Sequence, residues 1–151
     1  MRYLTEAFIA GALKRGRPVE QFLGPVRAPG RIGVSYVEVR PTKASYEVYL
    51  HTVEDVGHER FFDLVEFPPF AADQDEEEFG RLVATAEDPS NALTAAEEAT
   101  GAVPARWVNE GMVQDEYADF VRAGRPADQS PDGHPWPSRG ARGRHAAAPG
   151  V

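Results

Sequence analysis

The sequence predicts an α+β fold: a mainly antiparallel sheet of four to five strands with N-terminal helices, one strand–helix–strand crossover and a C-terminal helix. Apolar residues recur at helical spacing near both ends of the folded region, several central runs alternate between apolar and polar residues, and turns rich in Pro or Gly separate these segments. With 151 residues and a hydrophobic fraction of 42%, the chain is long enough for one domain with a substantial core.

The N-terminal region predicts two helical pieces. A first helix is expected from residue 5 to residue 15, because Gly16 follows two basic residues that suit the end of a helix. A second, short helical turn is expected over residues 17–24, opened by Pro18 and closed by glycine and proline. The apolar face of the first helix consists of Leu4, Phe8, Ile9, Ala12 and Leu13.

Three strands are expected in the middle of the chain. Residues 31–41 and 46–53 alternate between apolar and polar side chains, which is typical of a strand with one buried face. Residues 60–67 predict a third strand, but their apolar residues break strict alternation, which indicates either cover on both faces or a bulge. Residues 45–67 would then form a central hairpin joined by the polar connection VEDVGHE.

The next segment predicts the crossover. Residues 81–87 predict a fourth strand, residues 89–101 a helix that Asp88 caps, and residues 105–109 a short fifth strand. A strand, helix and strand in this order make the last two strands parallel if they share a sheet. A final helix is expected over residues 112–124, where the apolar residues form one stripe.

Composition places the domain boundary after the final helix. Residues 1–124 are expected to form a single acidic α+β domain. Residues 125–151 are rich in Pro, Gly, Ser, Ala and Arg and show no apolar periodicity. Such a segment has too little apolar surface to bury, so it is expected to be a disordered tail.

Composition also limits the location and source of the protein. The absence of cysteine excludes disulfides, thiolate metal sites and cysteine nucleophiles. The N-terminus lacks a signal-peptide pattern, and no run approaches the roughly 20 apolar residues of a membrane span. A cytoplasmic protein with no membrane partner is therefore expected. Arginine outnumbers lysine fourteen to two among many Ala, Gly and Pro, which share GC-rich codons and indicate a high-GC bacterial genome.

Charge is distributed unevenly along the chain. Residues 1–40 carry seven Arg or Lys and three Asp or Glu, residues 41–124 carry five and nineteen, and residues 125–151 carry four and two. The middle segment therefore has a net charge of −14. An acidic body repels phosphate backbones, which argues against nucleic acid as a partner. Two interpretations remain: the charge serves solubility, or it attracts a basic protein partner.

Two groups of acids predict where a basic partner would bind. One is a run of five acids in six positions from residue 73 to residue 78, since clustered charge of one sign speeds association with a basic ligand. A solvated loop is the alternative interpretation of this run. The other group lies in the connection of the expected hairpin. The predicted partner-binding residues are Asp73, Asp75, Glu76, Glu77, Glu78, Glu54, Asp55 and Glu59.

The same connection carries the candidate for metal chemistry. The stretch HTVEDVGHE, residues 51–59, holds two imidazoles and three carboxylates, which are ligand types that divalent ions use. Its spacing matches no ligand motif, however, and a strand would direct His51 and Glu54 to different faces. No catalytic residue, metal or cofactor is therefore predicted. A metal-dependent hydrolase, or a small-molecule-binding regulatory domain, that uses residues 51–59 is the alternative hypothesis.

A possible pocket is predicted near the C-terminal helix, in the stretch WVNEGMVQDEY. Trp107 is expected in the core, and Asn109 and Gln114 would lie on a polar rim at the strand–helix junction. Capping of the helix by Asn109 is the alternative interpretation.

Two stretches, FFDLVEFPPF and RWVNEGMVQDEYADFVRAGRP, resemble segments of small actinobacterial proteins, some of which are similar to the immunity proteins paired with bacterial toxins. The resemblance extends over residues 1–126 and transfers no functional residue. It implies a cytoplasmic inhibitor whose acidic face occludes a basic toxin domain. The sequence therefore predicts a non-enzymatic protein-binding module of the immunity type, with a basic partner such as a cognate toxin.

Overall fold

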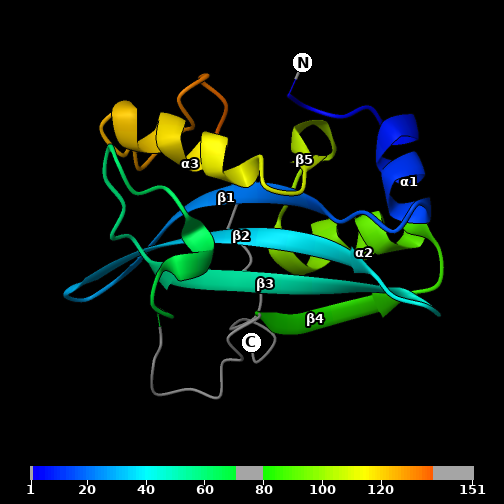
Figure 1. Ribbon diagram of the computed structural model, residues 1–151. Helices are drawn as coiled ribbons and strands as arrows, with labels where there is room; N and C mark the ends of the chain where they lie inside the picture. The colour runs from blue at the N-terminus through cyan, green and yellow to red at the C-terminus, as the bar shows by residue number, and fades with distance from the viewer. Residues whose placement is uncertain (1, 71–79, 138–151) are drawn as a thin grey trace, which may run out of the picture.

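The computed structural model describes residues 2–70 and 80–137. In chain order the elements are α1 (Glu6–Lys14), β1 (Val19–Ala28), β2 (Arg31–Pro41), β3 (Tyr46–Glu54), η1 (Leu64–Glu66), β4 (Arg81–Ala86), α2 (Pro89–Thr100), η2 (Pro104–Arg106), β5 (Val108–Asn109) and α3 (Val113–Arg122). The strands form one antiparallel sheet in the order β4-β3-β2-β1-β5 (Figure 1). The predicted α+β fold class is confirmed. No helix in these residues is long and apolar enough to cross a bilayer.

Most of the predicted elements are present. The helices predicted at residues 5–15, 89–101 and 112–124 and the strands predicted at residues 31–41, 46–53 and 81–87 form. Of the strand predicted at residues 105–109, only Val108–Asn109 forms, as β5, because Pro104–Arg106 is the 3₁₀ helix η2. The crossover also forms, and it passes from one edge of the sheet to the other, because β4 and β5 are the two edge strands. Since every pair between them is antiparallel, β4 and β5 run in the same direction, as expected.

The helical turn predicted for residues 17–24 is wrong, because the chain from Val19 onward forms β1. Val19 and Leu23 face the core beneath α1 and α2, whereas Phe22 faces the core on the other side of the sheet. A strand that is buried on both faces lacks polar residues at alternate positions, so the segment shows no strand-like period. A β-bulge between Phe22 and Gly24 breaks the register further.

The third strand predicted for residues 60–67 is also wrong, so the predicted hairpin of residues 45–67 does not form. β3 pairs with β2 and β4 instead, and the segment after β3 is a loop that contains η1. Asp63 caps η1, since its carboxylate accepts a hydrogen bond from the Val65 N–H at 3.3 Å. Leu64 and Phe67 of this loop are buried in the second core and Phe61 and Phe62 pack partly against it, whereas Val65 is exposed. Burial here follows the shape of the loop and not a strand, which explains why the apolar residues do not alternate.

The first face of the sheet packs against α1 and α2, which lie together on that side (Figure 1). Burial of apolar side chains here, at about 25 cal/mol per Å², supplies much of the stability of the fold. The buried cluster consists of Ile9, Ala12, Leu13, Val19, Leu23, Val37, Val39, Val48, Leu50, Ala92, Leu93, Ala96, Ala102 and Trp107.

The second face is covered in part by α3, η1 and the segment after α3. Tyr117 of α3 is the centre of this core and is fully buried. Its hydroxyl donates to the carboxylate of Asp55 and accepts a hydrogen bond from the Gly57 N–H at 2.9 Å. These bonds tie the connection after β3 to α3. The ring of Tyr117 contacts four aromatic side chains, those of Phe22, Phe62, Phe67 and Phe120.

Residues 125–137, predicted as the start of a disordered tail, pack against this second core. The ring of Trp136 lies 5.5 Å from that of Phe22 and 5.7 Å from that of Phe120, both edge-to-face. The packed domain therefore extends beyond the boundary that composition predicts. Residues 138–151, the rest of the predicted tail, lie outside the described residues.

Replacement of Trp136 tests whether this segment belongs to the domain. Trp136→Ala is expected to lower the free energy of unfolding by about 2–4 kcal/mol, measured by urea denaturation, because it removes a half-buried ring from the second core. His134→Ala, an exposed change in the same segment, is expected to alter it by less than about 0.5 kcal/mol. Equal effects of the two variants would show that the segment contributes no core packing.

Candidate functional site

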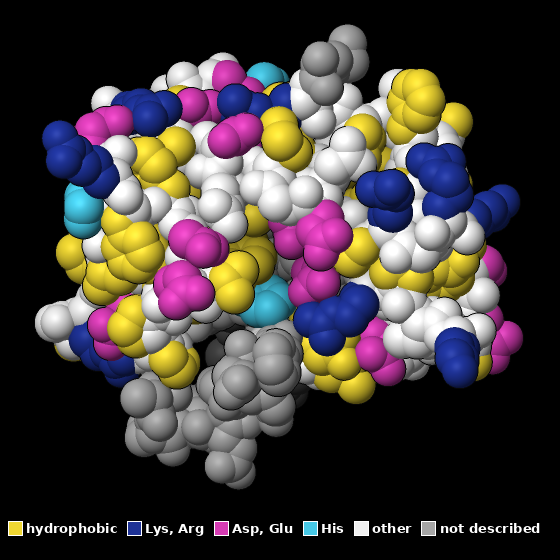
Figure 2. Space-filling view, in the orientation of Figure 1, with side chains coloured by type: hydrophobic (Ala, Val, Ile, Leu, Met, Phe, Trp, Pro, Cys, Tyr) yellow, Lys and Arg dark blue, Asp and Glu magenta, His cyan; other side chains and the backbone are white. Residues whose placement is uncertain are grey.

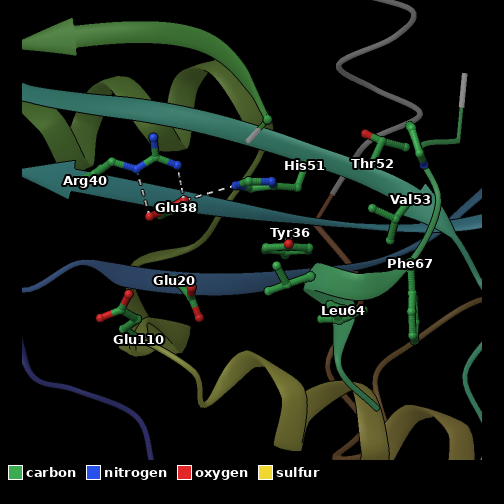
Figure 3. A pocket seen from close by; sticks show the side chains of 13 residues that line it. Glu20, Tyr36, Glu38, Arg40, His51, Thr52, Val53, Leu64, Phe67 and Glu110 are labelled. Atoms are coloured by element: carbon green, nitrogen blue, oxygen red, sulfur yellow. Dashed lines mark hydrogen bonds and ion pairs between the residues drawn. The ribbon is translucent and has the colours of Figure 1, made fainter. Parts of the chain in front are cut away.

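The half of the second sheet face that the described residues leave open forms a pocket of about 390 Å³ (Figure 3). The strand register creates it: Glu38 on β2 lies opposite Glu20 on β1 and Tyr49 on β3, and Tyr36 lies opposite His51. Because alternate residues of paired strands point to the same face, these polar side chains lie together. The lining residues are Glu20, Tyr36, Glu38, Arg40, His51, Thr52, Val53, Leu64, Val65, Phe67, Pro69, Gly80 and Glu110.

The pocket has an acidic end and an apolar end. Glu20 and Glu110 lie on one side in Figure 3, and Leu64 and Phe67 lie on the other. The space-filling view of the same face shows a hollow near its centre, where a histidine lies between acidic and hydrophobic side chains (Figure 2). A site with this polarity suits a ligand that has one charged end and an apolar body.

His51 is held rigidly in the floor of the pocket. Its ring stacks on Tyr36, with centroids 4.4 Å apart and planes 6° from parallel. Its Nε2 lies 3.1 Å from Oε1 of Glu38. Gly80 packs so closely against the ring that a Cβ at this position would lie 2.6 Å from it, and Gly80 also has a positive φ of 98°. Both facts require glycine at this position.

Glu38 is the charged centre of the floor. Arg40 donates to both of its oxygens, from Nη2 at 2.8 Å and from Nε at 3.1 Å. Burial alone would raise the pKa of Glu38, but the hydrogen bonds and charges of His51 and Arg40 outweigh burial and lower this pKa to about 2. The guanidinium of Arg40 also lies 3.9 Å from the ring centre of Tyr49, which fixes its position. Glu38 is therefore ionised, and Arg40 and His51 occupy its two oxygens.

Glu20 is the buried carboxyl at the acidic end, and its residue is only 9% exposed. Its Oε1 accepts a hydrogen bond from the Gly111 N–H at 2.9 Å, in the turn before α3. Burial, helped by the charges of Glu38 and Glu110, raises the pKa of Glu20 to about 7 even though backbone N–H groups oppose the shift. Near neutral pH, Glu20 is thus present in both its protonated and its ionised form.

The two buried carboxyls differ in what they can do. Opposite pKa shifts on neighbouring carboxyls are common in acid–base catalysis. Here Arg40 and His51 occupy Glu38, so it is not free to act as a base toward a substrate. Glu20 and Glu110, in contrast, form no ion pair with any Arg, Lys or His in the described parts of the chain. This arrangement favours the binding of a cation.

None of the predicted partner-binding acids that the structure describes lines this pocket. Asp73, Asp75, Glu76, Glu77 and Glu78 are outside the described residues. The other three have arginine partners: Glu54 with Arg31, Asp55 with Arg125 and Glu59 with Arg122. The side chain of Asp55 is only 1% exposed, so this residue stabilises the connection after β3 and does not face a partner. Glu54 and Glu59 are exposed at the surface, and their role in binding stays a prediction.

The residues of the predicted pocket do not line one cavity. Trp107 lies in the first core, and its Nε1 donates to Glu97 at 3.3 Å. Gln114 lies on the opposite side of the sheet, where its side chain donates to Asp63 at 3.0 Å. Asn109 ends β5. The residue after Asn109, Glu110, is the part of this stretch that does line the large pocket.

The residues of the metal hypothesis also separate. His51 lies in the pocket floor, whereas His58 lies in the loop after β3, where its Nδ1 accepts a hydrogen bond from the Arg60 N–H at 3.3 Å. Within residues 2–70 and 80–137, no group of three or more His, Cys, Asp or Glu side chains is placed to hold a metal ion.

The sequence pattern pointed to His51 but not to Glu20, Glu38 or Arg40 as pocket residues, although part of the signal for them is visible. Tyr36, Glu38 and Arg40 alternate along one predicted strand, and Glu47, Tyr49 and His51 alternate along the next. Pairing these two strands side by side would have placed a carboxylate, a guanidinium and an imidazole on one face. Glu20 gave no such signal, because its segment was assigned to a helical turn.

Comparisons with known proteins give no indication of function, so we infer function from the geometry of the site. A scan against protein-family models finds no match, and searches of curated proteins and of solved structures find none either.

The raised pKa of Glu20 predicts a pH-dependent effect of Glu20→Gln on stability. The folded-state pKa of about 7 lies above the ordinary value of 4.5, so ionisation destabilises the folded state as pH rises through this window. Glutamine carries no charge and keeps an oxygen for the Gly111 N–H. Glu20→Gln is therefore expected to raise the free energy of unfolding by about 1–3 kcal/mol at pH 8 and to leave it nearly unchanged at pH 4.

Urea denaturation at both pH values measures this difference. Glu98→Gln, an exposed change on α2, is the matched control and is expected to have little effect at either pH. A loss of stability in Glu20→Gln at pH 8 would contradict the assignment of Glu20 as an uncompensated buried carboxyl.

Proposed function

We propose that this chain is a non-enzymatic binding module that receives a positively charged group of a basic protein partner in its acidic pocket. The observation that carries the proposal is the pair of carboxyls, Glu20 and Glu110, that line the pocket without a cationic partner among the described residues. A buried carboxyl interacts more strongly with an incoming cation than a surface carboxyl does, because water screens it less. An arginine or lysine of a partner would supply the missing charge.

The surroundings of the pocket support a protein partner. Val65, which lines the pocket, is 75% exposed, and Leu82, on the neighbouring edge strand, is 49% exposed. Leu82 is the cross-strand neighbour of Tyr49, so it lies on the same sheet face as the pocket. Exposed apolar residues around a charged pocket are typical of protein interfaces, which combine apolar contacts with a few ionic anchors.

The biological role that fits these features is an immunity-like inhibitor in the cytoplasm of an actinobacterium. The net charge of −14 over residues 41–124 supports attraction to a basic toxin domain and argues against nucleic acid as the partner. An inhibitor of this kind needs no catalytic group. It needs a surface that occupies the cationic residues of the toxin.

The proposal predicts a salt-sensitive complex with the toxin encoded beside this gene. Affinity, measured by isothermal titration calorimetry, is expected to fall at least tenfold between low and high salt, because opposite charges attract across the interface. The double variant Glu20→Gln with Glu110→Gln is expected to lose a further tenfold or more, because a partner cation would be left buried without a counter-charge.

Two control variants sharpen this experiment. Glu98→Gln on α2 is expected to bind as the parent does. Neutralising the acids from Asp75 to Glu78 tests the other predicted surface and is expected to slow association more than it speeds dissociation. Full affinity in the pocket double variant, together with full inhibition of the toxin, would rule out the pocket as the binding site.

A further inference from the structure

The same pocket is larger than a single side chain of a partner requires. Its volume of about 390 Å³ falls in the range of small-molecule sites, roughly 300–1,000 Å³. We infer that the pocket also binds a free, small amphipathic monocation, that is, a protonated amine attached to an aromatic or branched hydrocarbon body. This inference rests on the proposed function of the chain as a non-enzymatic binder of a cationic group.

The charges that face the pocket select a cation. Three carboxyls, one guanidinium and one imidazole line it: Glu20, Glu38, Glu110, Arg40 and His51. The guanidinium and the imidazole both contact Glu38, so these three groups largely compensate one another. The other two carboxyls remain. An anion would meet them without a free counter-charge, and a neutral ligand would leave them unpaired.

The two remaining carboxyls make different contributions. Glu20 is buried and lines the cavity, and the hydrogen bond from the Gly111 N–H fixes the position of its carboxylate. An ammonium group beside it would form a charge-assisted hydrogen bond in a poorly solvated place. Glu110 is exposed at the rim, where water weakens its attraction. Glu20 therefore dominates recognition, and Glu110 assists it.

The apolar end of the pocket selects the body of the ligand. Leu64 and Phe67 are buried in the wall, and Val53 and Pro69 complete it, so this wall is formed before a ligand arrives. Val65 is largely exposed at the opening and would be covered by a ligand body. A hydrophilic cation would leave this wall exposed to water, so an apolar body adds to the affinity.

The first experiment compares three ligands of the same shape. Phenethylammonium, neutral 2-phenylethanol and anionic 3-phenylpropionate are titrated into the full chain at pH 8, and binding is followed by the backbone amide NMR signals of Gly80, Gly111 and Leu64. The amine is expected to shift these signals to saturation and to bind at least tenfold more tightly than the alcohol, with weaker binding still for the anion. Equal affinity for amine and alcohol would overturn the inference.

The second experiment assigns the site. Glu20→Gln is expected to weaken phenethylammonium binding at least tenfold and Glu110→Gln about twofold to threefold, whereas Glu98→Gln is expected to leave it unchanged. Unaltered dispersion of the NMR spectrum verifies that each variant is folded. Undiminished binding in both pocket variants would place the amine elsewhere and overturn the inference.

The outcomes separate this inference from the proposed function. Binding of the toxin that depends on Glu20, with no binding of phenethylammonium, would contradict the small-ligand inference and leave the protein-binding function in place. Binding of phenethylammonium that depends on Glu20, with toxin affinity unaffected by Glu20→Gln, would contradict the protein-binding function and retain the small-ligand site.

Discussion

A five-stranded sheet has two faces to protect from water, and residues 2–70 and 80–137 cover one face and part of the other. α1 and α2 pack on the first face, and α3 packs on the second around the buried ring of Tyr117. The hydroxyl of Tyr117 binds Asp55 and Gly57, so the helix, the sheet and the long connection after β3 depend on one another. The part of the second face that α3 does not reach becomes the pocket.

The polar side chains that line the pocket differ in charge balance. In the centre, Arg40 and His51 offset the charge of Glu38, whereas Glu20 on β1 has no such counter-charge among the described residues. Glu38, between Arg40 and His51, satisfies the rule that a buried carboxylate needs counter-charges and hydrogen bonds. Among the described residues, Glu20 has backbone N–H groups but no cation as a partner, and two further carboxyls lie near it, so it bears the energetic cost of burial. Uncompensated groups of this kind concentrate at functional sites, because a ligand that relieves them binds more tightly.

The sequence predicts the fold class and most of the helices and strands, but it does not predict the strand neighbours or the site. Helix caps and periodicity located α1, α2 and α3, and alternation located β2 and β3. β1 was missed because both of its faces are buried, and the loop at η1 was mistaken for a strand because its aromatic residues fill a core. The pocket depends on which strands are neighbours. Glu20 and Glu38 are 18 positions apart in sequence and meet only through the β1–β2 register.

The central claim is that Glu20 is a buried, uncompensated carboxyl that a cation stabilises in its ionised form. The ¹³C chemical shift of its carboxyl carbon, followed from pH 4 to pH 9, measures this directly. The account predicts a midpoint near 7 in the free protein and a midpoint lower by about one pH unit or more with saturating phenethylammonium. A midpoint near 4.5 that phenethylammonium does not move would contradict the account.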